Sequence, residues 1–222
     1  PRLDLFLNHF LTLQRRDETI VAQLFSAYKD FVEEQDGTSA AEQMKRFSTY
    51  ADVYESFEQF PADSREGLFF YRLSELDTTT VFPLLLEVVK RYSPDKRDAL
   101  LQIMSDLESF FVRRTVCQLT AKNYNRFVVD LLKELHDTDD YSPARVRMFL
   151  MRSQAETARW PDDDEFRTSW MTVPFYKRLK KKTRMILEAL ELALYTGKTE
   201  KVTIDAKLTI EHLRSEEHTS EL

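Results

Sequence analysis

Glycine, cysteine and long apolar runs are scarce in this sequence of 222 residues. Only three glycines are present, Gly37, Gly67 and Gly197. The single cysteine, Cys117, cannot form an internal disulfide and fits a reducing cytoplasm. No apolar run reaches the roughly 18 residues that span a bilayer, and no signal peptide is visible. The sequence therefore predicts a cytoplasmic protein without a membrane segment, and its start at Pro1 predicts that it is cut from a longer chain.

What the chain does contain points to helices. It is 42% hydrophobic and 32% charged, with sixteen phenylalanines and many Leu, Glu, Lys and Arg residues. Its net charge is −6, from 32 basic and 38 acidic residues. This balance disfavours a surface that binds nucleic acid everywhere, but it leaves room for a local basic patch.

Apolar residues recur at helical spacing along most of the chain, and start signals separate the helices. Ser39 and Glu42 have the spacing of a capping box, and Ser93-Pro94 and Ser142-Pro143 each place a cap before a proline. The loops are short, which favours one helical array over separated domains. We therefore expect an all-α fold, a multi-helix array followed by at most one short C-terminal β-strand.

A basic segment near the C-terminus is the clearest candidate for a binding surface. Residues 177–184 hold six cations within eight positions. On one long helix, Lys177, Lys181 and Arg184 would share a face, with Lys182 beside it. We predict that these four residues contact DNA phosphates, which would make binding depend on salt. The alternative is an ordinary solvated helix face.

Two other charged clusters have simpler interpretations. Residues 160–166 hold four carboxylates that could bind a divalent metal, but acidic residues are also favoured in the first helical turn. We predict a helix start there and assign no metal ligands. Arg113 and Arg114 could bind phosphate or pair with carboxylates on other helices, and for an acidic helical protein we predict pairing.

His212 is the candidate catalytic residue. Leu208 and Ile210 alternate with polar residues as in a half-buried strand, which ends in Glu211-His212. In nucleases that build a site from two strands and a helix around one metal, a histidine on a strand is the general base that activates water.

Several of these features, taken in order, resemble the GmrSD-type restriction endonucleases, which are modification-dependent (type IV) systems against phage DNA. The features are Arg113-Arg114-Thr-Val-Cys-Gln-Leu119, Asn123-Tyr-Asn-Arg-Phe127, Trp160-Pro-Asp-Asp-Asp-Glu-Phe166, Lys182-Thr-Arg-Met-Ile-Leu-Glu188 and Leu208-Thr-Ile-Glu-His212. The resemblance implies an N-terminal domain that uses a nucleoside triphosphate, a helical middle region and a C-terminal HNH-like nuclease domain. It also implies that Glu211-His212 begins the family's Glu-His-Ile-x-Pro-Gln motif, with His212 as general base.

The sequence departs from this family pattern after Leu213, because no Pro-Gln pair follows. We accordingly expect three parts: a helical domain (1–206), the first strand of a truncated nuclease domain (207–213) and a non-native tail (214–222). By this resemblance the parent protein cleaves modified phage DNA with a divalent metal, Mg²⁺, while the fragment itself is inactive. The nucleoside triphosphate would belong to the missing N-terminal domain, and neither cofactor is expected in this fragment.

A second hypothesis is a non-catalytic helical module that binds a protein partner or links the nucleotide-using domain to its effector. It predicts DNA binding that does not respond to salt, or none. It also predicts an exposed aromatic patch, for instance among Phe57, Phe60, Phe69 and Phe70.

Overall fold

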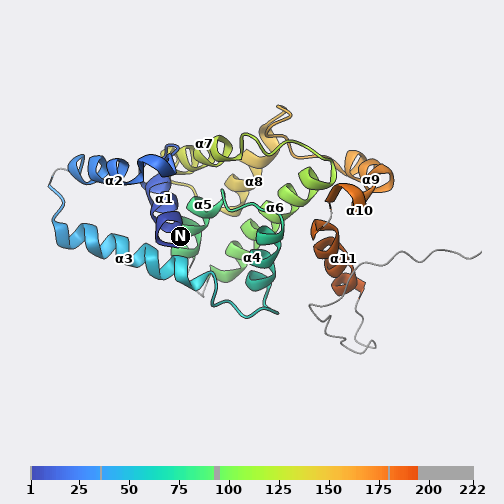
Figure 1. The fold of residues 1–222 in the computed structure, drawn as a ribbon, viewed down its shortest axis with the longest axis horizontal. Coiled ribbons are helices and arrows are strands. Elements are labelled where there is room, and N and C mark those ends of the chain that lie inside the picture. Colours follow the sequence, from blue (N-terminus) through green and yellow to red (C-terminus); the bar gives the residue numbers. More distant parts are fainter. Residues whose placement is uncertain (1, 36, 93–95, 180, 195–222) are drawn as a thin grey trace, which may run out of the picture. The chain divides into compact units, whose positions relative to one another are not determined.

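The computed structural model describes residues 2–35, 37–92, 96–179 and 181–194, and in these ranges the fold is all-α, as predicted (Figure 1). The predicted C-terminal strand, 207–213, lies outside the described residues. None of the described helices is both long and apolar enough to cross a membrane. The helices, including one 3₁₀ helix (η1), are α1 Arg2–Arg15, η1 Val21–Gln23, α2 Leu24–Glu33, α3 Ala40–Ser56, α4 Arg65–Glu75, α5 Phe82–Arg91, α6 Arg97–Val116, α7 Tyr124–Asp137, α8 Pro143–Arg152, α9 Asp163–Thr172, α10 Phe175–Leu179 and α11 Lys181–Leu194.

Helix starts follow the local sequence signals at three places. Ser39 and Glu42 form the predicted capping box of α3, in which each side chain bonds the backbone N–H of the other residue. Ser142 caps α8, with Pro143 in the first turn. Asp162 accepts a hydrogen bond from the Glu165 N–H and caps α9. Ser93-Pro94 lies outside the described residues.

The chain divides into two compact units, 1–173 and 174–222. In the first unit α1 packs against α2, α3 and α5, and their aromatic rings form a cluster. Phe10 is central to it, because its ring lies 5.3 Å from Phe47 and 5.7 Å from Tyr50, both edge-on. Edge-to-face pairs of this kind contribute about 0.5–1.5 kcal/mol beyond their buried area.

The aromatic patch expected near α4 does not form on the surface, and that prediction is wrong. Phe57 and Phe69 are buried, and Phe60 and Phe70 are half-buried. Phe70 stacks on Phe57 at 4.6 Å and on Phe60 at 5.7 Å between ring centroids. These rings shield one another from solvent, because Phe70 lies against Phe57, Phe60 and Phe69.

The long helix α6 is the support on which α4, α8 and α9 pack. Its Phe110 stacks on Phe127 of α7 with centroids 5.1 Å apart. Glu108 on the same helix accepts hydrogen bonds from Arg65 and Arg72 of α4 at 2.8 and 2.7 Å. Helix α6 is thus held by both apolar stacking and charge pairs, which fixes the side chains along its length.

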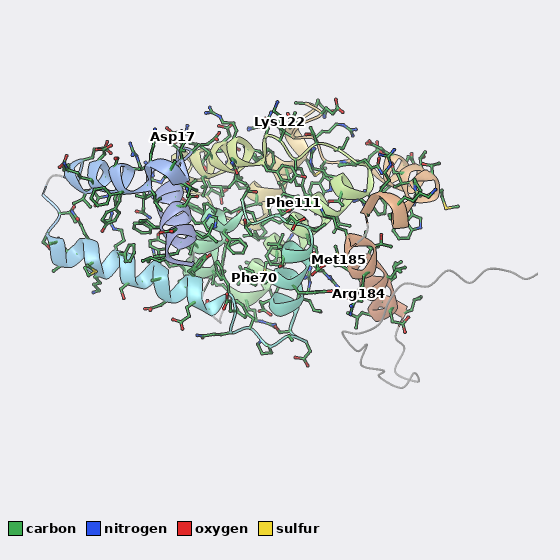
Figure 2. All side chains as sticks on the ribbon, viewed as in Figure 1. Asp17, Phe70, Phe111, Lys122, Arg184 and Met185 are labelled. Carbon is green, nitrogen blue, oxygen red and sulfur yellow. The ribbon has the colours of Figure 1, made fainter. Side chains whose placement is uncertain are left out.

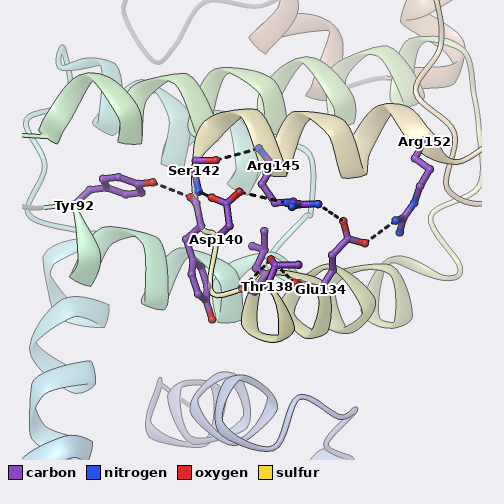
Figure 3. A network of polar contacts seen from close by, with 9 residues as sticks. Tyr92, Glu134, Thr138, Asp140, Ser142, Arg145 and Arg152 are labelled. Carbon is purple, nitrogen blue, oxygen red and sulfur yellow. Dashed lines mark hydrogen bonds and ion pairs between the residues drawn. The ribbon is translucent and has the colours of Figure 1, made fainter.

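A polar network connects α7 and α8 in the first unit (Figure 3). Arg145 lies between Asp140 and Glu134, and Arg152 also pairs with Glu134 at 2.7 Å. Tyr92, just after α5, donates to the backbone carbonyl of Tyr141 at 2.8 Å. These contacts fix the start of α8 and therefore the direction in which its later residues, including Arg147, are presented.

Candidate nucleic-acid interface

The basic segment does not form the single long helix that we predicted. Its residues lie on two helices, α10 and α11, in the second unit. The Thr183 hydroxyl donates to the Phe175 carbonyl oxygen at 3.0 Å. In a continuous helix, two residues eight positions apart are separated by about 12 Å along the axis. The prediction of one shared face for Lys177, Lys181 and Arg184 is therefore wrong.

The predicted DNA contacts have different surroundings on these two helices. Lys177 on α10 is exposed, as is its neighbour Arg178. On α11, Lys182 and Arg184 are half-buried, and Arg184 donates to Glu188 one turn later at 2.7 Å. Figure 2 labels Arg184 on this helix. Lys181 begins α11, and its side chain lies outside the described residues. DNA binding by these residues stays a prediction.

The acidic segment at 162–165 has a structural role, as predicted. Besides the Asp162 cap, Asp163 pairs with Arg113 at 2.5 Å, and Glu165 pairs with Arg159. The hydrogen bonds from these arginines hold the pKa values of Asp163 and Glu165 below their ordinary range. Across the described parts of the chain, no three His, Cys, Asp or Glu side chains gather where they could hold a metal ion.

Arg113 and Arg114 both bond inside the first unit. The Arg113–Asp163 pair joins α6 to α9, which confirms the predicted pairing between helices. Arg114 is fully buried and bonds no carboxylate among the described residues, so the predicted pairing is wrong for Arg114. Its guanidinium donates instead to the Tyr124 hydroxyl and to three backbone carbonyl oxygens, those of Thr120, Glu156 and Arg159.

A groove of about 680 Å³ lies between α6, α8 and the start of α9, and sequence reasoning missed it. Asp106, Arg147 and Trp160 are among its lining residues. The sequence did contain a signal for this groove, because Asp106 lies one helical turn from Ile103 and from Phe110 on the buried face of α6. A carboxylate among such apolar positions needs a partner. That partner, Arg147, is 41 residues away and could not be identified from spacing.

The proposed general base, His212, lies outside the described residues. The divalent metal implied for the complete nuclease finds no ligand set among the residues described.

Comparison with known proteins adds one match. Residues 160–221 match the family model described as GmrSD restriction endonucleases, C-terminal domain. No curated protein and no solved structure matches the chain. The family match begins at Trp160, in the acidic segment, and includes α9, α10 and α11. It supports the family resemblance over residues 160–221, and the motifs that begin at Arg113 and Asn123 lie before the matched segment.

Proposed function

We propose that this chain is part of a DNA endonuclease that cleaves modified phage DNA, because residues 160–221 match the family model described as GmrSD restriction endonucleases, C-terminal domain. The observation that carries the proposal is this match, which includes the predicted DNA contacts, Lys177 to Arg184, and the predicted base, His212. Residues 1–206 would be the helical region that precedes the first nuclease strand, 207–213.

In this proposal His212 accepts a proton from the water that attacks the phosphodiester. A bond forms between the water oxygen and phosphorus, and the bond from phosphorus to the leaving sugar oxygen breaks. A divalent ion, Mg²⁺ by family resemblance, would stabilise the negative charge when bound in the complete nuclease. The proposed nucleotide-using domain would belong to the parent protein and would act as an intramolecular partner.

Lys177 and Lys182 would contact the DNA backbone from two different helices. Each phosphate that a protein neutralises contributes about −0.9 to the slope of log affinity against log salt. We expect Lys177→Glu combined with Lys182→Glu to weaken duplex binding at least tenfold and to reduce this slope by about 2. Fluorescence anisotropy with a labelled duplex at several salt concentrations measures both quantities.

Lys45→Glu is the matched control, because Lys45 is an exposed lysine on α3, outside the basic segment. It changes the net charge by half as much as the double variant and should leave the slope nearly unchanged. Equal slopes for the original chain and the double variant would contradict DNA binding by the basic segment.

We further propose that the 222-residue chain binds DNA but does not cleave it. Its sequence continues from Leu213 to Arg214-Ser-Glu-Glu without the Pro-Gln pair of the family motif. Incubation with modified phage DNA and Mg²⁺ should leave the DNA intact on a gel. Cleavage that is lost in His212→Ala would show that the chain holds a complete site, and would contradict the proposed inactivity.

A second candidate function, a helical module that binds a protein partner, is favoured by one observation. Leu187, Leu190 and Leu194 are 45%, 42% and 73% exposed on α11. Their spacing of three and four residues places them on one face, the pattern of helices that bind in grooves. If this function is the correct one, Leu190→Lys will abolish partner binding while the charge reversals above leave DNA affinity unchanged.

A further inference from the structure

An exposed face runs along η1 and the first turns of α2, and the described residues leave it uncovered. The ring of Phe25 is 82% exposed, and Val21, four residues earlier, is 58% exposed. Residues three or four positions apart share one side of a helix. We call this side the α2 face; its members, all exposed, are Val21, Ala22, Phe25, Ser26 and Lys29. Contiguous exposed apolar side chains, unlike single ones, mark surfaces that bind a partner.

The other side of α2 is already used by the core. Leu24 and Phe31 are buried there, and the Phe31 ring lies edge-on to Phe10 of α1 with centroids 5.9 Å apart. Phe25 directly follows Leu24 and is therefore turned about 100° away around the helix. The packing of α2 on α1 thus leaves the Phe25 ring without a cover.

The charges along this segment complement those of a second, antiparallel copy. Lys29 lies one turn after Phe25, and its side chain is 64% exposed in a surface pair with Glu33 at 3.7 Å. Asp17 and Glu18 lie before Phe25, and both are exposed. They line a hollow of about 270 Å³ at the start of the segment. Reversing the direction of a second copy would therefore bring its lysine to these carboxylates.

The arginines next to these carboxylates interact with other groups. Arg15 donates to the Ala27 carbonyl oxygen at 3.4 Å and pairs with Glu34 at 3.6 Å. Arg16 is half-buried, and its charge acts on Tyr141. No side chain among the described residues bonds the Glu18 carboxylate, which leaves it accessible to a cation from another molecule.

We propose that the α2 face binds the same face of a second copy of this chain, with the two segments antiparallel about a two-fold axis. Each Phe25 ring would cover the small side chain of Ala22 in the other copy. The same register brings Lys29, four residues after Phe25, to Glu18, four residues before Ala22. Two-fold symmetry forms each of these contacts twice. This inference requires neither DNA nor the nuclease site.

The dimer should be weak and reversible. Stable complexes bury about 1,200–2,000 Å² in total, and one aromatic side chain buries only about 150–250 Å². The α2 face contains a single aromatic ring, so we expect association only at high protein concentration. In sedimentation velocity the average mass should rise with concentration from 26.3 kDa toward twice this value. A mass of one copy at every concentration would overturn the proposal.

Phe25→Glu tests the centre of the face. It removes the apolar contact and should raise the dissociation constant about tenfold or more. Met171→Glu on α9 is the matched control, because Met171 is also 82% exposed, and it should leave the dissociation constant unchanged. Circular dichroism checks that both variants are folded. Equal weakening by the two variants would overturn the assignment to α2.

Lys29→Glu and Glu18→Lys test the antiparallel register. Each variant alone places like charges at both contacts and should weaken the dimer about fivefold. Mixed in equal amounts, the two variants should associate as well as the original chain, because each lysine at these positions then faces a glutamate of the other copy. A mixture that associates no better than either variant alone would overturn the proposed pairing. Neither result bears on duplex binding by Lys177 and Lys182.

Discussion

In residues 1–173 the arginines of α6 bond inside the fold, whereas in residues 174–194 Lys177 and Arg178 of α10 lie at the surface. Arg114 is fully buried with four acceptors, and Arg113 joins α6 to α9. Lys177 and Arg178 are exposed. The same charge thus joins helices at Arg113 and bonds the interior at Arg114, while at Lys177 and Arg178 it is accessible to solvent.

The largest effect should come from Arg114, where the first unit depends most on a charged side chain. Arg114→Met leaves the Tyr124 hydroxyl and three carbonyl oxygens without their donor. We expect it to lower the free energy of unfolding by about 3–5 kcal/mol, measured by urea denaturation. Arg126→Met is the control, because Arg126 forms an exposed pair with Asp130 and should change stability by less than about 0.5 kcal/mol. Equal losses in the two variants would contradict the distinction between buried and exposed arginines.

His9 should make the first unit sensitive to acid. Burial lowers its pKa from 6.5 to about 4, among the rings of Tyr54 and Phe82. The unfolded chain therefore binds the proton more tightly, and the stabilisation from neutral His9 is lost as the pH falls from 6.5 to 4. The full loss is about 3 kcal/mol at and below pH 4. Urea denaturation measures the free energy of unfolding at pH 7 and at pH 4. The difference between these two values should be smaller in His9→Phe than in the original chain, and an equal difference would contradict a role of His9 in the acid sensitivity.

Glu108 should have an intermediate effect, because it is a partly buried carboxylate with two arginine partners. Glu108→Gln weakens its bonds to Arg65 and Arg72 of α4. We expect a loss of about 1–2 kcal/mol in the free energy of unfolding. The exposed pair Lys29–Glu33 provides the comparison, and Glu33→Gln should cost less than about 0.5 kcal/mol. A loss for Glu108→Gln as small as that for Glu33→Gln would show that the α4–α6 pairs add little.

The smallest effect on stability is expected in the second unit. Lys177→Ala and Arg178→Ala remove exposed side chains and should change the free energy of unfolding by no more than about 0.5 kcal/mol. The same variants should still weaken duplex binding and flatten its salt dependence. Thermal denaturation together with anisotropy shows both results, and a large loss of stability would contradict the view that these charges lie free of the fold.

Short-range signals predicted some features of the fold and of the candidate site well. The helix starts at Ser39, Ser142 and Asp162 follow from side chains that reach a backbone N–H three residues away. The separation of α10 from α11 was not predictable in this way. The segment Lys177–Arg184 contains no Gly or Pro, and its break is recorded by the bond between Thr183 and Phe175.

The sequence by itself predicted the all-α class, the helix starts at Ser39, Ser142 and Asp162, and the resemblance of residues 160–221 to the matched family, because these depend on composition, on contacts within one helical turn and on ordered motifs. Only the tertiary structure decided that Phe57 and Phe69 become core, that Arg114 is buried, and that Asp106 meets Arg147 across 41 residues. Each of these depends on which helix faces which, and local spacing carries no information about that. The groove beside Asp106 exists for the same reason, since its walls come from α6, α8 and α9, which the packing brings together.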